Sequence, residues 1–65
     1  MRLRELLQFG EMELRAVGVP EASLDARLLL EHCTGKRRTE IFLESESEVD
    51  QKIQESYQLL LLRRK

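Results

Sequence analysis

The stretch LRAVGVPEASLDARLLLEHCTG, residues 14–35, contains one helix and the signals that separate it from its neighbours. Gly18 can adopt the left-handed conformation at the end of a preceding helix, and Pro20 cannot continue that helix. A second helix is predicted from about residue 21 or 22 to Cys33, and Gly35 ends it in the same way. Its apolar surface is too wide for one neighbour, so we expect a central helix contacted on two or three sides. That surface consists of Leu24, Leu28, Leu29, Leu30 and Cys33.

The segment before this stretch, LRELLQFGEMELRAV at residues 3–17, has the pattern of an amphipathic helix. Gly10 lies within its apolar face, where glycine costs up to about 1 kcal/mol relative to alanine. We therefore expect another helix to approach closely at Gly10. The other residues of this face are Leu3, Leu7, Leu14 and Val17, with Leu6 beside them.

Two more helices are predicted after Gly35. The segment RRTEIFLESE, residues 37–46, allows a short helix with Thr39 as its cap and with Ile41, Phe42 and Leu43 buried. A strand is the alternative, because Thr, Ile and Phe favour strands, but a single strand has no partner in this chain. The last helix follows Asp50, its expected N-cap, with Ser47 as the alternative. Its apolar face contains Ile53, Tyr57, Leu60 and Leu61.

The sequence as a whole therefore predicts an all-α fold, a small bundle of about four helices formed by residues 1–65 as one domain. Leu59 and Leu62 lie outside the main apolar face of the last helix. We expect them to contact residues beyond Lys65, so the chain has the character of part of a longer protein.

Composition excludes several classes of function. The chain has 11 basic and 12 acidic side chains, a balance that argues against a direct nucleic-acid binder or a polybasic membrane anchor. Its longest apolar runs, LLL and LLLL, are too short to span a membrane. Cys33 is the only cysteine, so no intrachain disulfide can form and a cytoplasmic protein is expected.

The residues that look reactive do not form a chemical site. His32 and Cys33 are adjacent on a predicted helix and point about 100° apart, which suits neither a zinc site nor a Cys–His nucleophile. We expect Cys33 to be a small buried hydrophobic residue. The segment GKRRT lacks the glycine and the Ser or Thr that a phosphate-binding loop requires, since positions 30 and 37 are Leu and Arg. No catalytic, cofactor-binding or metal-binding residue is predicted.

The remaining candidate is the basic turn formed by Lys36, Arg37 and Arg38. One interpretation is a solvated turn that complements the C-terminal end of the second helix. The other is a contact for an acidic partner surface, which makes these three residues the candidate partner-binding site. An acidic run follows and is expected to be a solvated connection that offsets the basic turn. It comprises Glu44, Glu46, Glu48 and Asp50.

Three motifs in order resemble the N-terminal domain of the HemK/PrmC family. They are GVP at residues 18–20, DA-x-LLL at 25–30 and GK-x-RT at 35–39, and the resemblance extends from Leu3 to Arg64. Members of this family use S-adenosylmethionine to methylate a glutamine side-chain amide in peptide-chain release factors. Their helical domain precedes a Rossmann-like catalytic domain with a glycine-rich loop and an Asn-Pro-Pro-Tyr motif, and this chain contains neither element.

The resemblance thus implies a non-catalytic, substrate-recognition domain of a two-domain methyltransferase, with S-adenosylmethionine bound by a catalytic domain beyond these residues. Its implied partners are a release factor and its own catalytic domain. Two alternatives stay open: a structural domain that only packs on the catalytic domain, and a free-standing adaptor that binds a partner helix.

Overall fold

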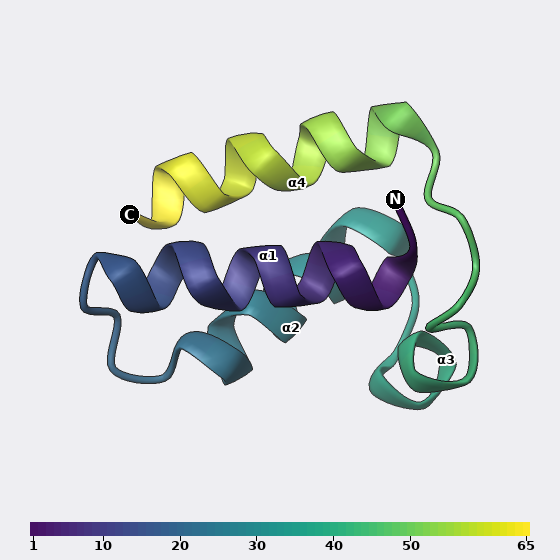
Figure 1. Ribbon diagram of the computed structural model, residues 1–65, viewed down its shortest axis with the longest axis horizontal. Helices are drawn as coiled ribbons and strands as arrows, with labels where there is room; N and C mark the ends of the chain where they lie inside the picture. Colours follow the sequence, from purple (N-terminus) through teal and green to yellow (C-terminus); the bar gives the residue numbers. More distant parts are fainter.

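Four helices make up the computed structural model, which describes residues 1–65. They are α1 (Leu3–Ala16), α2 (Ala22–Thr34), α3 (Arg38–Leu43) and α4 (Gln51–Arg64). Helices α1 and α4 lie side by side and run in the same direction, α2 packs against both, and α3 lies near the N-terminus (Figure 1). The only extended pairing is an isolated bridge between Arg2 and Glu48. The predicted all-α bundle is confirmed, and so is the choice of helix over strand for α3. None of the four helices has the length and hydrophobicity that a membrane-spanning segment needs.

The helix ends follow the turn signals of the sequence. Gly18 and Gly35 have φ angles of 81° and 70°, the left-handed conformation expected of them. Val19 N–H donates to the carbonyl of Leu14 at 3.0 Å, which closes the last turn of α1. At the start of α4, the carboxylate of Asp50 accepts a hydrogen bond from Lys52 N–H at 2.7 Å, so the predicted N-cap is confirmed.

One aromatic side chain joins three helices. Tyr57 of α4 is fully buried and its ring lies on Gly10 of α1, where an added Cβ would meet the tyrosine Oη at 2.0 Å. The same hydroxyl donates to the carbonyl of Ala26 in α2 at 2.9 Å. The close helix approach predicted from Gly10 is confirmed, and α4 is the helix that approaches.

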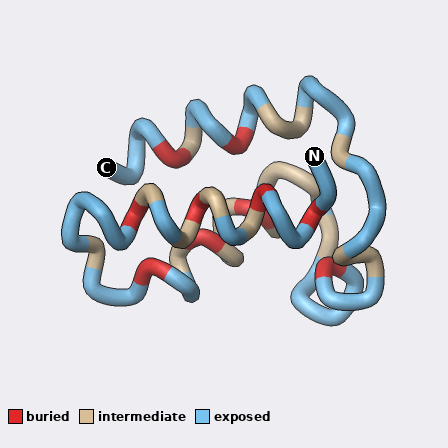
Figure 2. Tube along the Cα trace, viewed as in Figure 1, coloured by how far each residue is buried: buried red, intermediate tan, exposed pale blue.

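The core lies where α1, α2 and α4 face one another (Figure 2). Helix α2 contacts the other three helices, as expected of a central helix, but it buries mainly small residues. Ala22 and Ala26 let the neighbouring backbones come close, and Leu30 continues the same face. The full core set is Leu3, Leu6, Leu14, Ala22, Ala26, Leu30, Ile41, Tyr57 and Leu61.

Five apolar residues predicted to lie on packed faces are exposed instead. Val17 is the C-cap residue after α1. Its backbone is no longer helical, and its side chain is therefore exposed. Leu24 and Leu28 lie away from the alanine face that α2 turns to the core. Phe42 and Leu43 are 78% and 75% exposed, because the six-residue α3 buries only Ile41.

The predicted cap of α3 is also wrong. The helix begins at Arg38, one residue before Thr39, and Arg37 precedes it. Arg37 N–H donates to the carboxylate of Glu40 at 3.1 Å, so the acidic side chain of the first turn bonds the backbone of the residue before the helix, and Thr39 lies inside the helix instead of capping it.

The connection between α3 and α4 is fastened to the start of α1. Leu3 and Arg4 donate backbone hydrogen bonds to the carbonyls of Ser47 and Ser45, both at 2.9 Å. These bonds satisfy N–H groups that the first turn of a helix leaves without partners. Glu46 also pairs with Arg2 and Arg4, at 2.7 and 3.1 Å.

The acidic run therefore has more than one role. Glu44 pairs with Lys36 at 2.8 Å and offsets the basic turn, as expected. Glu48 instead pairs with the N-terminal ammonium at 2.9 Å, and Asp50 caps α4.

We predict that Gly10→Ala destabilises the domain by about 1–3 kcal/mol, because the new methyl group collides with the buried tyrosine ring. Helix propensity alone would favour alanine by up to about 1 kcal/mol. Urea unfolding of Gly10→Ala, Tyr57→Phe and the double variant measures the coupling. Removing the hydroxyl should make Gly10→Ala less costly, whereas additive effects would contradict this packing.

We also predict a loss of stability at alkaline pH that depends on Tyr57. Burial raises the pKa of Tyr57 well above its usual value. The unfolded chain releases the phenolic proton above about pH 10 while the folded chain retains it. The free energy of unfolding should therefore fall by about 1.4 kcal/mol per pH unit above that point.

The tyrosinate absorbance of this single tyrosine, followed with helicity, checks the prediction. Tyrosinate should form only as helicity is lost, and Tyr57→Phe should remove its share of the alkaline slope. Ionisation at the usual pH in a fully helical chain would show that the phenol is accessible.

Candidate functional site

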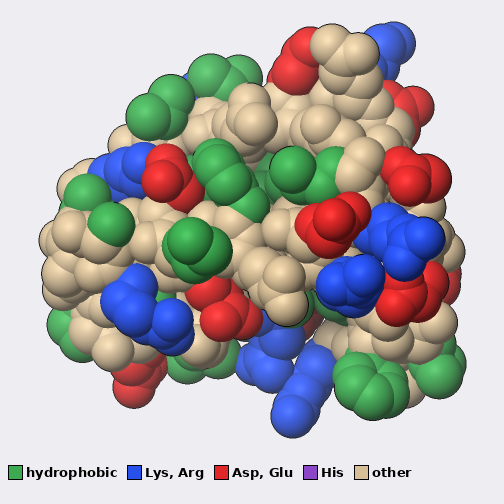
Figure 3. Space-filling model, in the orientation of Figure 1, with side chains coloured by type: hydrophobic (Ala, Val, Ile, Leu, Met, Phe, Trp, Pro, Cys, Tyr) green, Lys and Arg blue, Asp and Glu red, His purple; other side chains and the backbone are tan.

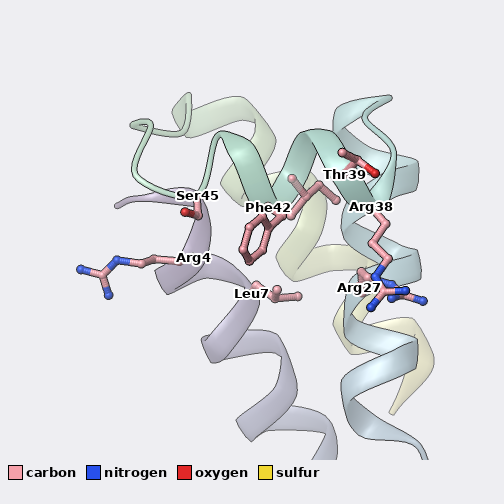
Figure 4. A pocket seen from close by; sticks show the side chains of 8 residues that line it. Arg4, Leu7, Arg27, Arg38, Thr39, Phe42 and Ser45 are labelled. Carbon is pink, nitrogen blue, oxygen red and sulfur yellow. The ribbon is translucent and has the colours of Figure 1, made fainter.

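A cavity of about 560 Å³ lies where α1, α2 and α3 meet. We call it the α3 groove. Its apolar lining comes from Leu7 of α1 and from Ile41 and Phe42 of α3 (Figure 4). Polar and basic side chains complete it, and no acidic side chain lines it. The full lining is Arg4, Leu7, Arg27, Arg38, Thr39, Ile41, Phe42 and Ser45.

The groove follows from how α3 is attached. Ile41 is 4% exposed and fixes α3 to the body of the domain, so the next residue, Phe42, is rotated by about 100° away from the core. The Phe42 ring projects toward Leu7 and stays largely exposed (Figure 4). Figure 3 shows hydrophobic side chains gathered over α3 on the surface, an exposure that often marks an interaction site.

Two guanidinium groups lie on one wall of the groove. Arg27 and Arg38 converge there, from α2 and from the start of α3, whereas Arg4 points away (Figure 4). Arg4 is already paired with Glu46, and no carboxylate pairs with Arg38. The Nε of Arg27 is buried 3.4 Å from the Glu31 carboxylate, with which Arg27 forms an ion pair but no hydrogen bond from this nitrogen. The wall therefore offers guanidinium N–H donors to an anionic group.

The three residues of the basic turn, predicted as a partner-binding site, lie in three different surroundings in the structure. Lys36 donates to Glu44 at 2.8 Å, a hydrogen bond that raises the pKa of the lysine, and it lines a different cavity of about 210 Å³. Arg37 is exposed and lines neither cavity, while Arg38 lines the α3 groove. That these three residues bind a partner stays a prediction, but the fold does not present them as one surface.

Sequence reasoning missed Arg27 and Phe42. Arg27 directly follows Ala26, so it could be placed beside the core only once the alanine face of α2 was known. Phe42 is a large apolar residue and was therefore predicted to be buried. The only sign against this was the short length of α3, because a six-residue helix can bury only one of its faces.

The His–Cys pair has no companion groups. His32 is exposed, and Cys33 packs against the core while remaining half-buried. Desolvation raises the pKa of the Cys33 thiol, which favours the poorly nucleophilic protonated form. The structure contains no group of three or more His, Cys, Asp or Glu side chains arranged to hold a metal ion.

Comparison with known proteins gives two matches. A family model described as the PrmC N-terminal domain matches residues 5–65. The release factor glutamine methyltransferase of Deinococcus radiodurans is 45% identical over 49 residues, which cover 75% of this chain. The chain spans only 18% of that relative's length. No solved structure matches the chain.

We predict that two neighbouring residues of α3 differ sharply in their effect on stability. Ile41→Ala removes a buried side chain and should lower the free energy of unfolding by about 2–4 kcal/mol. Phe42→Ala removes a larger but exposed side chain and should change it by less than about 0.5 kcal/mol. Urea denaturation of both variants provides the comparison. An equally large loss in Phe42→Ala would place Phe42 in the core rather than in a groove open to a partner.

Proposed function

The chain belongs to the family of PrmC N-terminal domains, and from this membership we propose that it is the substrate-recognition domain of a release factor glutamine methyltransferase. The relative that carries this name supports the proposal, with 45% identity over 49 residues. The proposed partner is a peptide-chain release factor, and the proposed setting is translation termination in the cytoplasm.

The methyl donor and the catalytic residues belong, in this proposal, to a domain outside residues 1–65. Donor sites in Rossmann-like folds lie at the carboxyl ends of parallel strands, next to a glycine-rich turn. This chain forms four helices, Gly10 is covered by Tyr57, and Gly18 and Gly35 each end a helix. Residues 1–65 therefore do not fit S-adenosylmethionine, and we assign them no step of the methyl transfer.

The observation that carries the recognition role is the α3 groove. It combines an exposed aromatic ring with two convergent arginines, and aromatic residues and arginine are enriched at protein interfaces. Binding energy gathered by this surface, remote from the reacting glutamine, can orient the release factor toward the catalytic domain.

A specific observation favours a second role, packing against the catalytic domain. Leu59 and Leu62 of α4 are 58% and 64% exposed, as expected for residues that contact another part of a longer protein. Figure 3 shows hydrophobic side chains gathered over the C-terminal half of α4. The α4 surface and the α3 groove involve different helices, so one domain can recognise substrate and pack on its neighbour.

We predict that deletion of residues 1–65 from the parent enzyme raises KM for the intact release factor about tenfold or more, because remote contacts are lost. Methylation of a short peptide containing the target glutamine should keep its kcat/KM, since the peptide cannot reach the deleted domain. Steady-state kinetics on both substrates makes the comparison. A purely structural domain would instead lower the thermal stability of the enzyme and reduce both activities alike.

The isolated 65-residue chain provides a control that does not require the truncated enzyme to fold. Added to the full enzyme, it should compete for intact release factor and leave peptide methylation unchanged. Failure to compete, together with an unchanged KM after deletion, would rule out the recognition role.

A further inference from the structure

The proposed function leaves open which feature of the release factor the domain contacts, and this inference rests on that function. We propose that the α3 groove binds an acidic segment of the release factor. A carboxylate of this segment lies between Arg27 and Arg38, and a neighbouring large apolar side chain packs on Leu7, Ile41 and Phe42.

Charge complementarity identifies the anionic half of this ligand. Three arginines and no acidic residue line the groove, although the whole chain has a net charge of −1. Arg38 has no carboxylate partner, and the ion pair of Arg27 with Glu31, 3.4 Å from Nε, includes no hydrogen bond from that buried nitrogen. Two guanidinium groups facing the same space repel each other until an anion lies between them, and their planar N–H donors match a carboxylate.

The apolar half of the ligand follows from Phe42. Its ring is 78% exposed, yet it points into a cavity of about 560 Å³, within the size range of ligand-binding pockets. An apolar side chain that enters between Phe42 and Leu7 removes both from water. The basic wall and the apolar lining are contiguous, so one short segment can satisfy both.

The distribution of charge favours an acidic protein segment over a nucleic acid. A polyanionic backbone needs a continuous row of unpaired cations. Here most basic side chains are already paired with carboxylates, including Arg4, which lines the groove and pairs with Glu46. The basic side chains without a carboxylate partner do not form a continuous row, since two lie at the start of α3 and two are on α4. They are Arg37, Arg38, Lys52 and Arg63.

The test is a titration of the 65-residue chain with intact release factor from the same organism, followed by calorimetry. Arg38→Glu and Phe42→Ala should each weaken binding by about tenfold, because each removes one half of the groove. Arg37→Glu and Leu43→Ala are matched controls, since both residues are exposed on or next to α3 and neither lines the groove. Each control should change the affinity by less than about twofold. Added salt should weaken wild-type binding more than it weakens binding of Arg38→Glu.

The outcomes separate this inference from the proposed function. Binding that survives unchanged in both groove variants would overturn the groove assignment and leave the recognition role intact. If the wild-type chain does not bind release factor at all, the recognition role fails and the groove assignment fails with it. Concentration-dependent dimerisation that Phe42→Ala abolishes, or tighter binding to RNA than to release factor, would identify a different occupant and also overturn the inference.

Discussion

The side chain of Tyr57 is the element on which the packing of this domain depends. Its ring fits only because residue 10 has no Cβ, and its hydroxyl finds an acceptor in the Ala26 carbonyl at 2.9 Å. A buried phenol must be hydrogen-bonded, because an unpaired polar group in the core is costly. One side chain therefore sets the distance between α1 and α4 and the position of both relative to α2. Ion pairs then fasten the far end of α4, from Arg64 to Asp25 at 2.7 Å and from Lys65 to Glu13 at 2.6 Å.

This arrangement of the core leaves another surface of α1 and α2 free to form the groove. Leu7 of α1 and Arg27 of α2 line the groove and are half-buried. Helix α3 contributes the buried Ile41 and the exposed Phe42 to the same lining. Because α3 is fixed by one buried isoleucine and by the connection fastened to α1, it can expose an aromatic ring without loss of the fold. Among the residues that line the groove, only Ile41 belongs to the buried core, so Arg38 and Phe42 can be altered without disturbing the packing of the domain.

Much of the fold follows from local signals in the sequence. Gly18, Gly35 and Asp50 mark helix ends through backbone conformation or a short-range hydrogen bond, and the structure confirms all three. Gly10 also revealed a close contact, because a glycine within an apolar face is costly unless something packs on it. Burial was less predictable. Leu24 and Leu28 looked like core residues, but the neighbours of α2 pack on Ala22 and Ala26, and no local rule chooses between those faces. The groove was least predictable, since Arg27 and Arg38 come from different helices whose relative rotation is fixed by tertiary packing.

The most direct test of the account is to map the contact surface by NMR on the labelled 65-residue chain with unlabelled release factor. Signal loss should be concentrated on α3 and on the groove residues Leu7 and Arg27, while the core around Tyr57 and the exposed leucines of α4 should keep their signals. Signal loss concentrated on Leu59 and Leu62, with α3 unaffected, would contradict it and would place recognition on α4.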